Sequence, residues 1–147
     1  YLANFDYYCT LQTDTEVIVY LFDLLIRKHG LTLEQACTAM APPFWSQIER
    51  MAPDDREVAR ALRIVYGGAL LNGPFSVVVG HSGGMIGSND RIKLRPLVAA
   101  RDEDMLYLAS EEAAIREVCR DPERLWHAKG GLPVVGQLKE TAQVPSK

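Results

Sequence analysis

The first part of the chain has the pattern of apolar and polar positions that is typical of helices. The stretch 13–16 (TDTE) fits a capping box, in which the threonine hydroxyl accepts from the amide three residues on and the glutamate reaches back to the threonine amide. Residues 17–29 after it are apolar on nearly every side, which predicts a buried helix. Gly30 supplies a left-handed residue to end that helix.

Two further helices are predicted before residue 70. Thr32 and Gln35 repeat the capping pattern ahead of a helix over 33–40, which the prolines at 42 and 43 terminate. The stretch 53–55 (PDD) starts a third helix, because proline and acidic residues are favoured in a first turn. Val58, Leu62, Val65 and Tyr66 form its expected apolar stripe.

After residue 74 the pattern changes to strands. Residues 75–79 and 85–88 predict one hairpin, with its turn at 82–84. Residues 97–100 and 105–109 predict a second, followed by a helix to about residue 120 and a last strand within 132–138. The polar tail 139–147 is expected to be flexible. Helices combined with two antiparallel hairpins indicate the α+β class.

Composition narrows the class of protein. The 147 residues are enough for one core and one domain, and 48% hydrophobic with 24% charged residues is typical of a globular domain. The 16 Lys and Arg against 19 Asp and Glu give a net charge of −3, which argues against nucleic acid and anionic membranes as partners. The longest apolar run, 17–25, contains Asp23 and is too short for a membrane span. No leader resembling a signal peptide precedes it.

The cysteines fit neither a disulfide framework nor a zinc site. Cys9, Cys37 and Cys119 are odd in number and widely separated, whereas both frameworks need paired spacings. We expect three reduced thiols in a cytoplasmic protein. The histidines lack metal spacing as well, so neither metal nor cofactor is expected.

One motif suggests a serine hydrolase. Residues 80–84 (GHSGG) match the G-x-S-x-G nucleophile elbow, with Ser82 as the nucleophile. That elbow requires a helix directly after the serine, and 85–90 has no helical stripe. A hairpin turn is therefore the preferred interpretation, and the Ser82 hydrolase stays as an alternative.

Four stretches, in this order, resemble motifs of class II glutamine amidotransferases, which are N-terminal-nucleophile hydrolases. Residues 12–16 (QTDTE) resemble S-D-S-E, and 72–76 (NGPFS) resemble the G-P-F/A-S entry to the central strand. Residues 90–97 (DRIKLRPL) resemble D-x-x-G-x-R-P-L, and 108–111 (LASE) resemble the A-S-E that opens the next helix. The stretch 31–45 is more similar to the helical insert of glutamate synthases than to that of amidophosphoribosyltransferases.

This resemblance implies an αββα sandwich and a glutaminase that supplies ammonia to a synthase subunit or domain. In the family, a cysteine at the mature N-terminus attacks the glutamine amide, and its own α-amino group manages the proton. The nucleophile, the carboxylate-binding arginine and the oxyanion-hole residues are then expected upstream of Tyr1, so residues 1–138 would be a partial domain without its catalytic segment. Cys9 is internal and does not replace the nucleophile, and Asn72-Gly73 lies in a turn and does not replace the oxyanion hole.

The resemblance also assigns residues that bind substrate. Asp14 matches the family aspartate that holds the α-ammonium group of glutamine, and Thr13 and Thr15 either shape the same pocket or serve only as the cap. Asp90, Arg95, Ser110 and Glu111 match positions expected to be scaffold. Lys93 departs from the pattern, because the family has glycine there and the turn then lacks a residue that is free to be left-handed.

The expected partners are glutamine, the ammonia-accepting synthase and the upstream segment of the same domain, and a homo-oligomer stays open. Three alternatives remain: an amidophosphoribosyltransferase-type amidotransferase, a non-catalytic domain of the same fold, and the Ser82 hydrolase.

Overall fold

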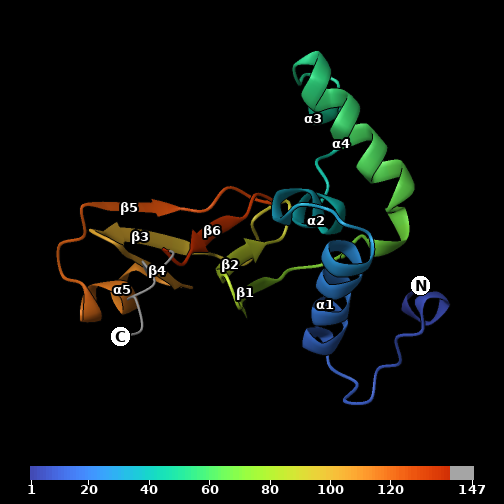
Figure 1. Ribbon diagram of the computed structural model, residues 1–147. Helices are drawn as coiled ribbons and strands as arrows, with labels where there is room; N and C mark the ends of the chain where they lie inside the picture. The colour runs from blue at the N-terminus through green and yellow to red at the C-terminus, as the bar shows by residue number, and fades with distance from the viewer. Residues whose placement is uncertain (140–147) are drawn as a thin grey trace, which may run out of the picture.

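The computed structural model describes residues 1–139 (Figure 1). The predicted flexible tail therefore lies outside the described residues, except for Lys139. The helical elements are η1 (Leu2–Phe5), α1 (Asp14–Phe22), η2 (Asp23–Lys28), α2 (Leu33–Met40), α3 (Trp45–Ile48), α4 (Pro53–Val65), η3 (Gly67–Ala69) and α5 (Glu112–Val118). The strands are β1 (Ser76–His81), β2 (Gly84–Asn89), β3 (Val98–Asp102), β4 (Met105–Ala109), β5 (Arg124–His127) and β6 (Val134–Gln137).

The first predicted helix is present, but its start differs from the expected capping box. The Thr13 hydroxyl accepts from the Glu16 amide at 3.2 Å, as predicted. The Glu16 side chain does not return to Thr13 and binds the backbone at Thr10 and Leu11. Helix α1 continues directly into the π-helix η2, and Gly30 follows with a φ of +70°. The predicted end at Gly30 is confirmed, whereas the glutamate half of the box is wrong.

Helix α2 begins and ends where the sequence predicts. The Thr32 side chain accepts from the Gln35 amide at 3.2 Å, and the Gln35 side chain accepts from the Thr32 amide at 3.0 Å. Both halves of this capping box are therefore formed.

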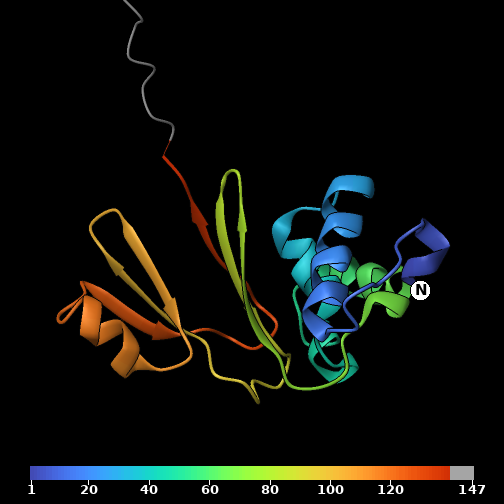
Figure 2. The ribbon, with the colours of Figure 1, turned by 90° about the horizontal axis from the view of Figure 1, so that it is seen from below.

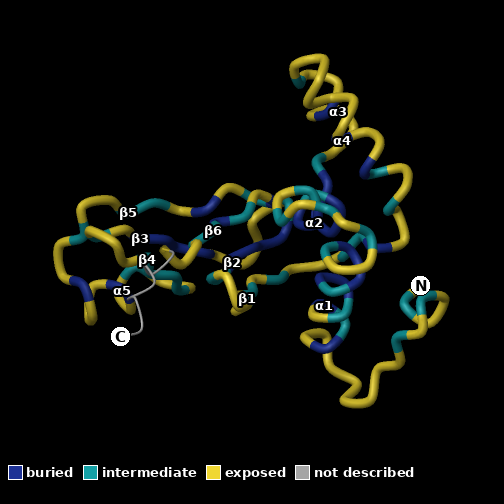
Figure 3. Tube along the Cα trace, viewed as in Figure 1, coloured by how far each residue is buried: buried dark blue, intermediate teal, exposed yellow. Residues whose placement is uncertain are grey.

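Helix α4 begins at Pro53 as expected, but its predicted apolar stripe is only partly buried. Together with α3 it extends away from the other elements, and most of its surface is exposed (Figure 3). Leu62 is 7% exposed, whereas Val58 is 48% and Val65 is 68% exposed. The prediction that these two valines are buried is wrong, because α4 packs against other helices only on the side of Ala59 and Leu62.

The strands form two three-stranded antiparallel sheets. The first has the order β1-β2-β6 and the second the order β4-β3-β5. Both predicted hairpins are confirmed, with Val79 opposite Ile86 and Ala100 opposite Tyr107. The predicted last strand is β6, which pairs with β2. Strand β5 was not predicted, and it completes the second sheet beside β3.

The two sheets lie next to one another, with helices on their outer sides (Figure 2). One apolar cluster joins α1, η2 and α2 to the first sheet through Ile86. A second lies between the sheets, where Val134 of β6 meets Ala99 of β3, and a third places Ile115 of α5 against β3. The fold is therefore α+β, with two antiparallel sheets between helices.

Close contact between the sheets depends on small residues. A Cβ on Gly87 of β2 would lie 2.9 Å from a methyl group of Leu108, and one on Gly136 of β6 would lie 2.6 Å from a methyl group of Leu106. Both leucines belong to the second sheet. Glycines on β2 and β6 thus bring the two sheets together.

Candidate functional site

Asp14 lies in the first turn of α1, at the edge of an open cavity of about 280 Å³. Among the described residues, its carboxylate forms neither a hydrogen bond nor an ion pair. The N-terminus of a helix favours a negative charge there. The cavity is lined by Asp14, Val17, Ile18, Leu71, Asn72, Gly73, Pro74 and Phe75.

The segment 71–75 lines this cavity and is anchored at both ends. The Leu71 amide donates to the Met40 carbonyl at 2.9 Å, and the Phe75 carbonyl accepts from the Asp90 amide at 3.0 Å. Between these anchors, Gly73 has a φ of +138°, a conformation that favours glycine. The fold therefore brings residues of two stretches that resemble family motifs, Asp14 of 12–16 and 72–75 of 72–76, into the lining of one cavity.

Thr13 and Thr15 occupy different positions from Asp14. Thr13 is exposed and its hydroxyl is engaged as the cap of α1, while Thr15 is exposed and is not among the residues that line the cavity. Asp14 is thus the one of the three that meets the cavity. The sequence placed Asn72 and Gly73 in a turn and excluded them as the oxyanion hole, and only long-range packing brings them into this lining.

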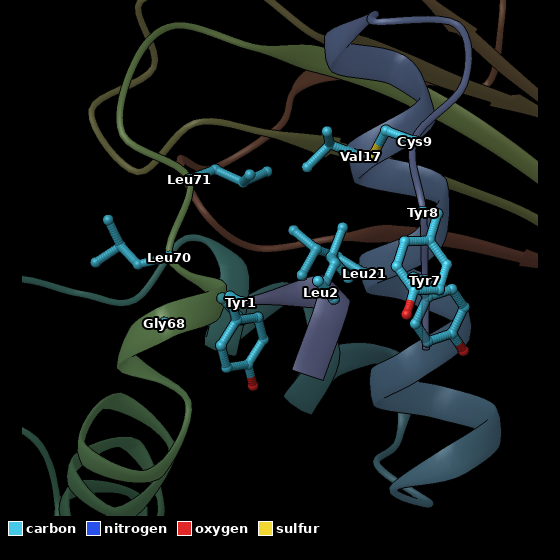
Figure 4. Close-up of a pocket in the computed structure, with 12 residues that line it drawn as sticks. Tyr1, Leu2, Tyr7, Tyr8, Cys9, Val17, Leu21, Gly68, Leu70 and Leu71 are labelled. Carbon is cyan, nitrogen blue, oxygen red and sulfur yellow. The ribbon is translucent and has the colours of Figure 1, made fainter. Parts of the chain in front are cut away.

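A second cavity of about 440 Å³ adjoins the first and shares Val17 and Leu71 with it (Figure 4). Its walls are mainly apolar and aromatic and include Tyr1, Leu2, Tyr8 and Leu21. Residue patterning gave no signal for it, because the segment 1–12 has no clear period. The two adjoining cavities form a surface hollow along α1, with Asp14 at one end.

The N-terminal segment that borders this hollow is attached through side chains of α1 and η2. The Tyr7 hydroxyl donates a hydrogen bond to the Asp23 carboxylate, and the Lys28 ammonium donates one to the Phe5 carbonyl at 2.7 Å. The Asp23 carboxyl has its pKa lowered to about 2, chiefly by hydrogen bonds from Arg27 and then from Tyr7. These contacts fix the segment against the helices.

The motif 90–97 forms a loop organised around a buried aspartate. The Asp90 carboxylate accepts from the amides of Ile92, Leu94 and Arg95 at 3.0–3.2 Å. Burial raises the pKa of this carboxyl, but the backbone hydrogen bonds outweigh burial and hold the pKa below its ordinary value. Asp90 therefore stabilises the loop.

Lys93 adopts the left-handed conformation in this loop, with a φ of +58°. The expectation that the turn does without a left-handed residue at this position was wrong. The backbone amides on both sides of Lys93 donate to the Asp90 carboxylate, and within this loop lysine adopts the left-handed conformation despite its Cβ.

Ser82 lies in the turn of the first hairpin. Strand β1 ends at His81 and β2 begins at Gly84, so a strand follows the serine where the nucleophile elbow requires a helix. The Gly83 amide donates to Nδ1 of His81 at 3.1 Å, as in a local turn. This geometry supports the hairpin interpretation.

The three cysteines are free thiols on separate elements. Cys37 and Cys119 are buried and Cys9 is exposed. Burial raises the pKa of the Cys37 thiol to about 11, which disfavours the reactive thiolate. Within residues 1–139, no group of three or more His, Cys, Asp or Glu side chains is placed to bind a metal ion.

The chain is similar to a protein of Archaeoglobus fulgidus that carries the name "Uncharacterized protein". The two are 48% identical over 139 residues, which are 95% of this chain and 37% of the relative. The chain thus spans little more than a third of that relative's length. No family model and no solved structure matches the chain. Among the helices of the described part, none has the length and apolar character to cross a membrane.

Proposed function

We propose that the chain is part of a class II glutamine amidotransferase domain, most similar to that of glutamate synthases, and that Asp14 binds the α-ammonium group of glutamine. One observation carries the proposal: the free carboxylate of Asp14 and the segment 72–75 line the same cavity. Each was matched to a motif of that family from the sequence alone. A carboxylate at the rim of an apolar cavity suits a ligand with an ammonium group and a short carbon chain.

The arrangement of layers supports the same family. Its αββα sandwich places two antiparallel sheets between helices, and here α1 and α2 cover the first sheet while α5 covers the second. The two sheets share an apolar cluster, as stacked sheets require. The similarity concerns only the order of the helix and sheet layers, and it does not involve the catalytic segment.

The loop 90–97 gives independent support. The family motif has glycine where this chain has Lys93, and Lys93 has the positive φ that glycine adopts most readily. A positive φ at this position is what a glycine in the motif would favour, and this supports the match although the residue here is lysine. This agreement involves a different segment from the Asp14 cavity.

The proposed reaction needs groups beyond those found here. The nucleophilic cysteine, the carboxylate-binding arginine and the oxyanion-hole residues are expected upstream of Tyr1, and the ammonia would pass to a synthase subunit or domain. In this proposal the 147 residues alone bind glutamine weakly and do not hydrolyse it. The complete protein is a cytoplasmic enzyme.

Steady-state glutaminase assays on the complete protein test the role of Asp14. Asp14→Asn removes the charge while keeping the shape, and we expect the KM for glutamine to rise about tenfold or more, since a charge-assisted contact is lost. Asp54→Asn is the matched control, because Asp54 is also a first-turn acid, on α4. It should leave KM unchanged.

Two outcomes would contradict the proposal. Equal KM values for Asp14→Asn and the parent would remove Asp14 from the substrate site. Absence of glutamate release by the complete protein, together with absence of cysteine labelling by a glutamine-like alkylating agent, would favour the non-catalytic domain of the same fold. The residue at the mature N-terminus of the complete protein distinguishes the enzyme from the non-catalytic domain, because the enzyme requires cysteine there.

A further inference from the structure

A separate cavity of about 240 Å³ is lined by residues of α2, of α3 and the segments that flank it, of the loop 90–97 and of the loop between β5 and β6. The residues that line it include Thr38, Gln47, Arg91, Lys129, Gly130 and Gly131. None of the Asp14 cavity residues is shared with it. Neither the motif resemblance nor the proposed glutaminase reaction uses this cavity.

The cavity carries positive charge without a compensating carboxylate. Arg91 and Lys129 belong to its lining, which contains neither aspartate nor glutamate. The ion pairs within residues 1–139 involve neither of these cations. The neighbouring Asp90 does not form an ion pair with these cations, because its carboxylate accepts hydrogen bonds from backbone amides of its own loop.

The Arg91 guanidinium is held in place and partly desolvated. It stacks on the ring of Phe44 at 4.5 Å, and its Nη1 atom is buried without a hydrogen-bond partner. A buried guanidinium nitrogen without an acceptor is unfavourable, so Arg91 is a cation whose hydrogen-bonding capacity is not met within its own fold.

A second guanidinium adds to the positive field. Arg63 of α4 stacks on the ring of Trp45 at 4.5 Å and donates to the Pro43 carbonyl. Its pKa is lowered, first by burial and then by the charge of Arg91. Two arginines whose charges disfavour one another are thus held beside one short segment, 43–45.

The backbone around the cavity is closely packed. A Cβ on Gly130 would lie 2.7 Å from the Arg91 carbonyl oxygen, and Gly131 has a φ of +72° with its Cβ position 2.7 Å from the Ala41 carbonyl oxygen. The Gly131 amide donates to the Asn89 carbonyl at 3.2 Å. Glycines therefore let the loop that carries Lys129 lie close against the backbone of Arg91, which brings both residues into the lining of one cavity.

We propose that this cavity binds a phosphate-type oxyanion, with Arg91 and Lys129 as its ligands and Arg63 contributing long-range attraction. A dianion balances the two lining cations, and the forked guanidinium matches the geometry of phosphate oxygens. The volume holds several water molecules and is thus sufficient for phosphate. Either free phosphate or a small phosphate monoester supplies this chemistry.

Isothermal titration of the full chain with inorganic phosphate tests the site, at about pH 8, where phosphate is doubly charged. Ionic strength is held constant with chloride. We expect saturable binding with one site per chain. Arg91→Gln and Lys129→Gln should each weaken it about tenfold or more, and the control Arg120→Gln, an exposed arginine after α5, should change it less than about twofold.

Several outcomes would overturn the proposal. No saturable heat with the parent protein, or equal weakening by all three variants, would leave only general charge attraction. Acetate binding as tightly as phosphate would contradict the preference for a dianion. Lys129 is exposed and its replacement should leave folding intact, so an unchanged affinity in Lys129→Gln would count against the site even if Arg91→Gln failed to fold. Titration with a phosphate monoester such as glycerol phosphate then separates the two sources of the ligand.

Discussion

The carboxylate of Glu16 accepts a hydrogen bond from the backbone amide of Thr10 at 2.8 Å and thereby joins the first turn of α1 to the segment before it. The same carboxylate accepts from the Leu11 amide at 2.7 Å and from the Tyr20 hydroxyl at 3.3 Å. Glu16 is 9% exposed, so these contacts replace most of its hydration. Its position two residues from Asp14 makes it a support for that edge of the cavity.

Glu16→Gln is expected to lower stability and to make it less dependent on pH. Hydrogen bonds from the Thr10 backbone, followed by burial acting in the opposite direction, leave the pKa of Glu16 below its ordinary value of 4.5. The stabilisation is thus complete above 4.5 and is lost as the pH falls through the lower folded-state pKa. Urea midpoints measured from neutral to acidic pH should differ most at neutral pH and converge in acid.

Glu57→Gln is the matched control for this prediction, because Glu57 is an exposed helical glutamate on α4. Its urea midpoint should follow the parent at each pH. A parent-like midpoint for Glu16→Gln at neutral pH would show that these contacts do not hold the N-terminal segment.

On helix α4, shortening the side chain of Leu62 is expected to lower the stability of the protein, whereas shortening that of Val65 is not. Leu62 is buried, and Leu62→Ala should lower the free energy of unfolding by about 2 kcal/mol, because it leaves a gap against the neighbouring helices. Val65→Ala should change it by less than about 0.5 kcal/mol, since that side chain is 68% exposed. Chemical denaturation of both variants measures the contrast, and equal losses would mean that Val65 is covered in solution.

Elements with local sequence signals were predicted correctly, whereas features that depend on packing partners were not. The capping box at Thr32 and Gln35 is local and predicted the start of α2 correctly, and the prolines at 42 and 43 predicted its end. Strand β5 was not predicted because four residues with a polar residue at each end carry little periodicity, and only its pairing with β3 defines it. The exposure of part of the predicted stripe on α4 was missed for a related reason. Apolar spacing predicts a buried stripe, but the elements that pack against the helix decide which residues of that stripe are covered.

The sites depend still more on long-range packing. Asp14 and Asn72 line one cavity, where the segment after η3 is tied to Met40, and no local pattern links the two residues. A family resemblance selected both stretches without predicting that they share a cavity. Arg91 and Lys129 belong to different loops, and only the close approach of Gly130 and Gly131 brings them together.

Lys93→Gly is expected to increase stability, although glycine normally destabilises a folded chain. Lys93 has a φ of +58°, and a side chain in that conformation costs about 1 kcal/mol or somewhat more relative to glycine. The greater freedom of glycine in the unfolded state offsets part of that gain, so we expect a net stabilisation of about 0.5 kcal/mol. Lys93→Ala is the control, because alanine keeps the Cβ and should leave stability within about 0.5 kcal/mol of the parent. Urea denaturation compares the three proteins. A loss of stability in Lys93→Gly larger than that in Lys93→Ala would contradict a left-handed residue at this position, and with it the backbone path that supports the match to the family's D-x-x-G motif.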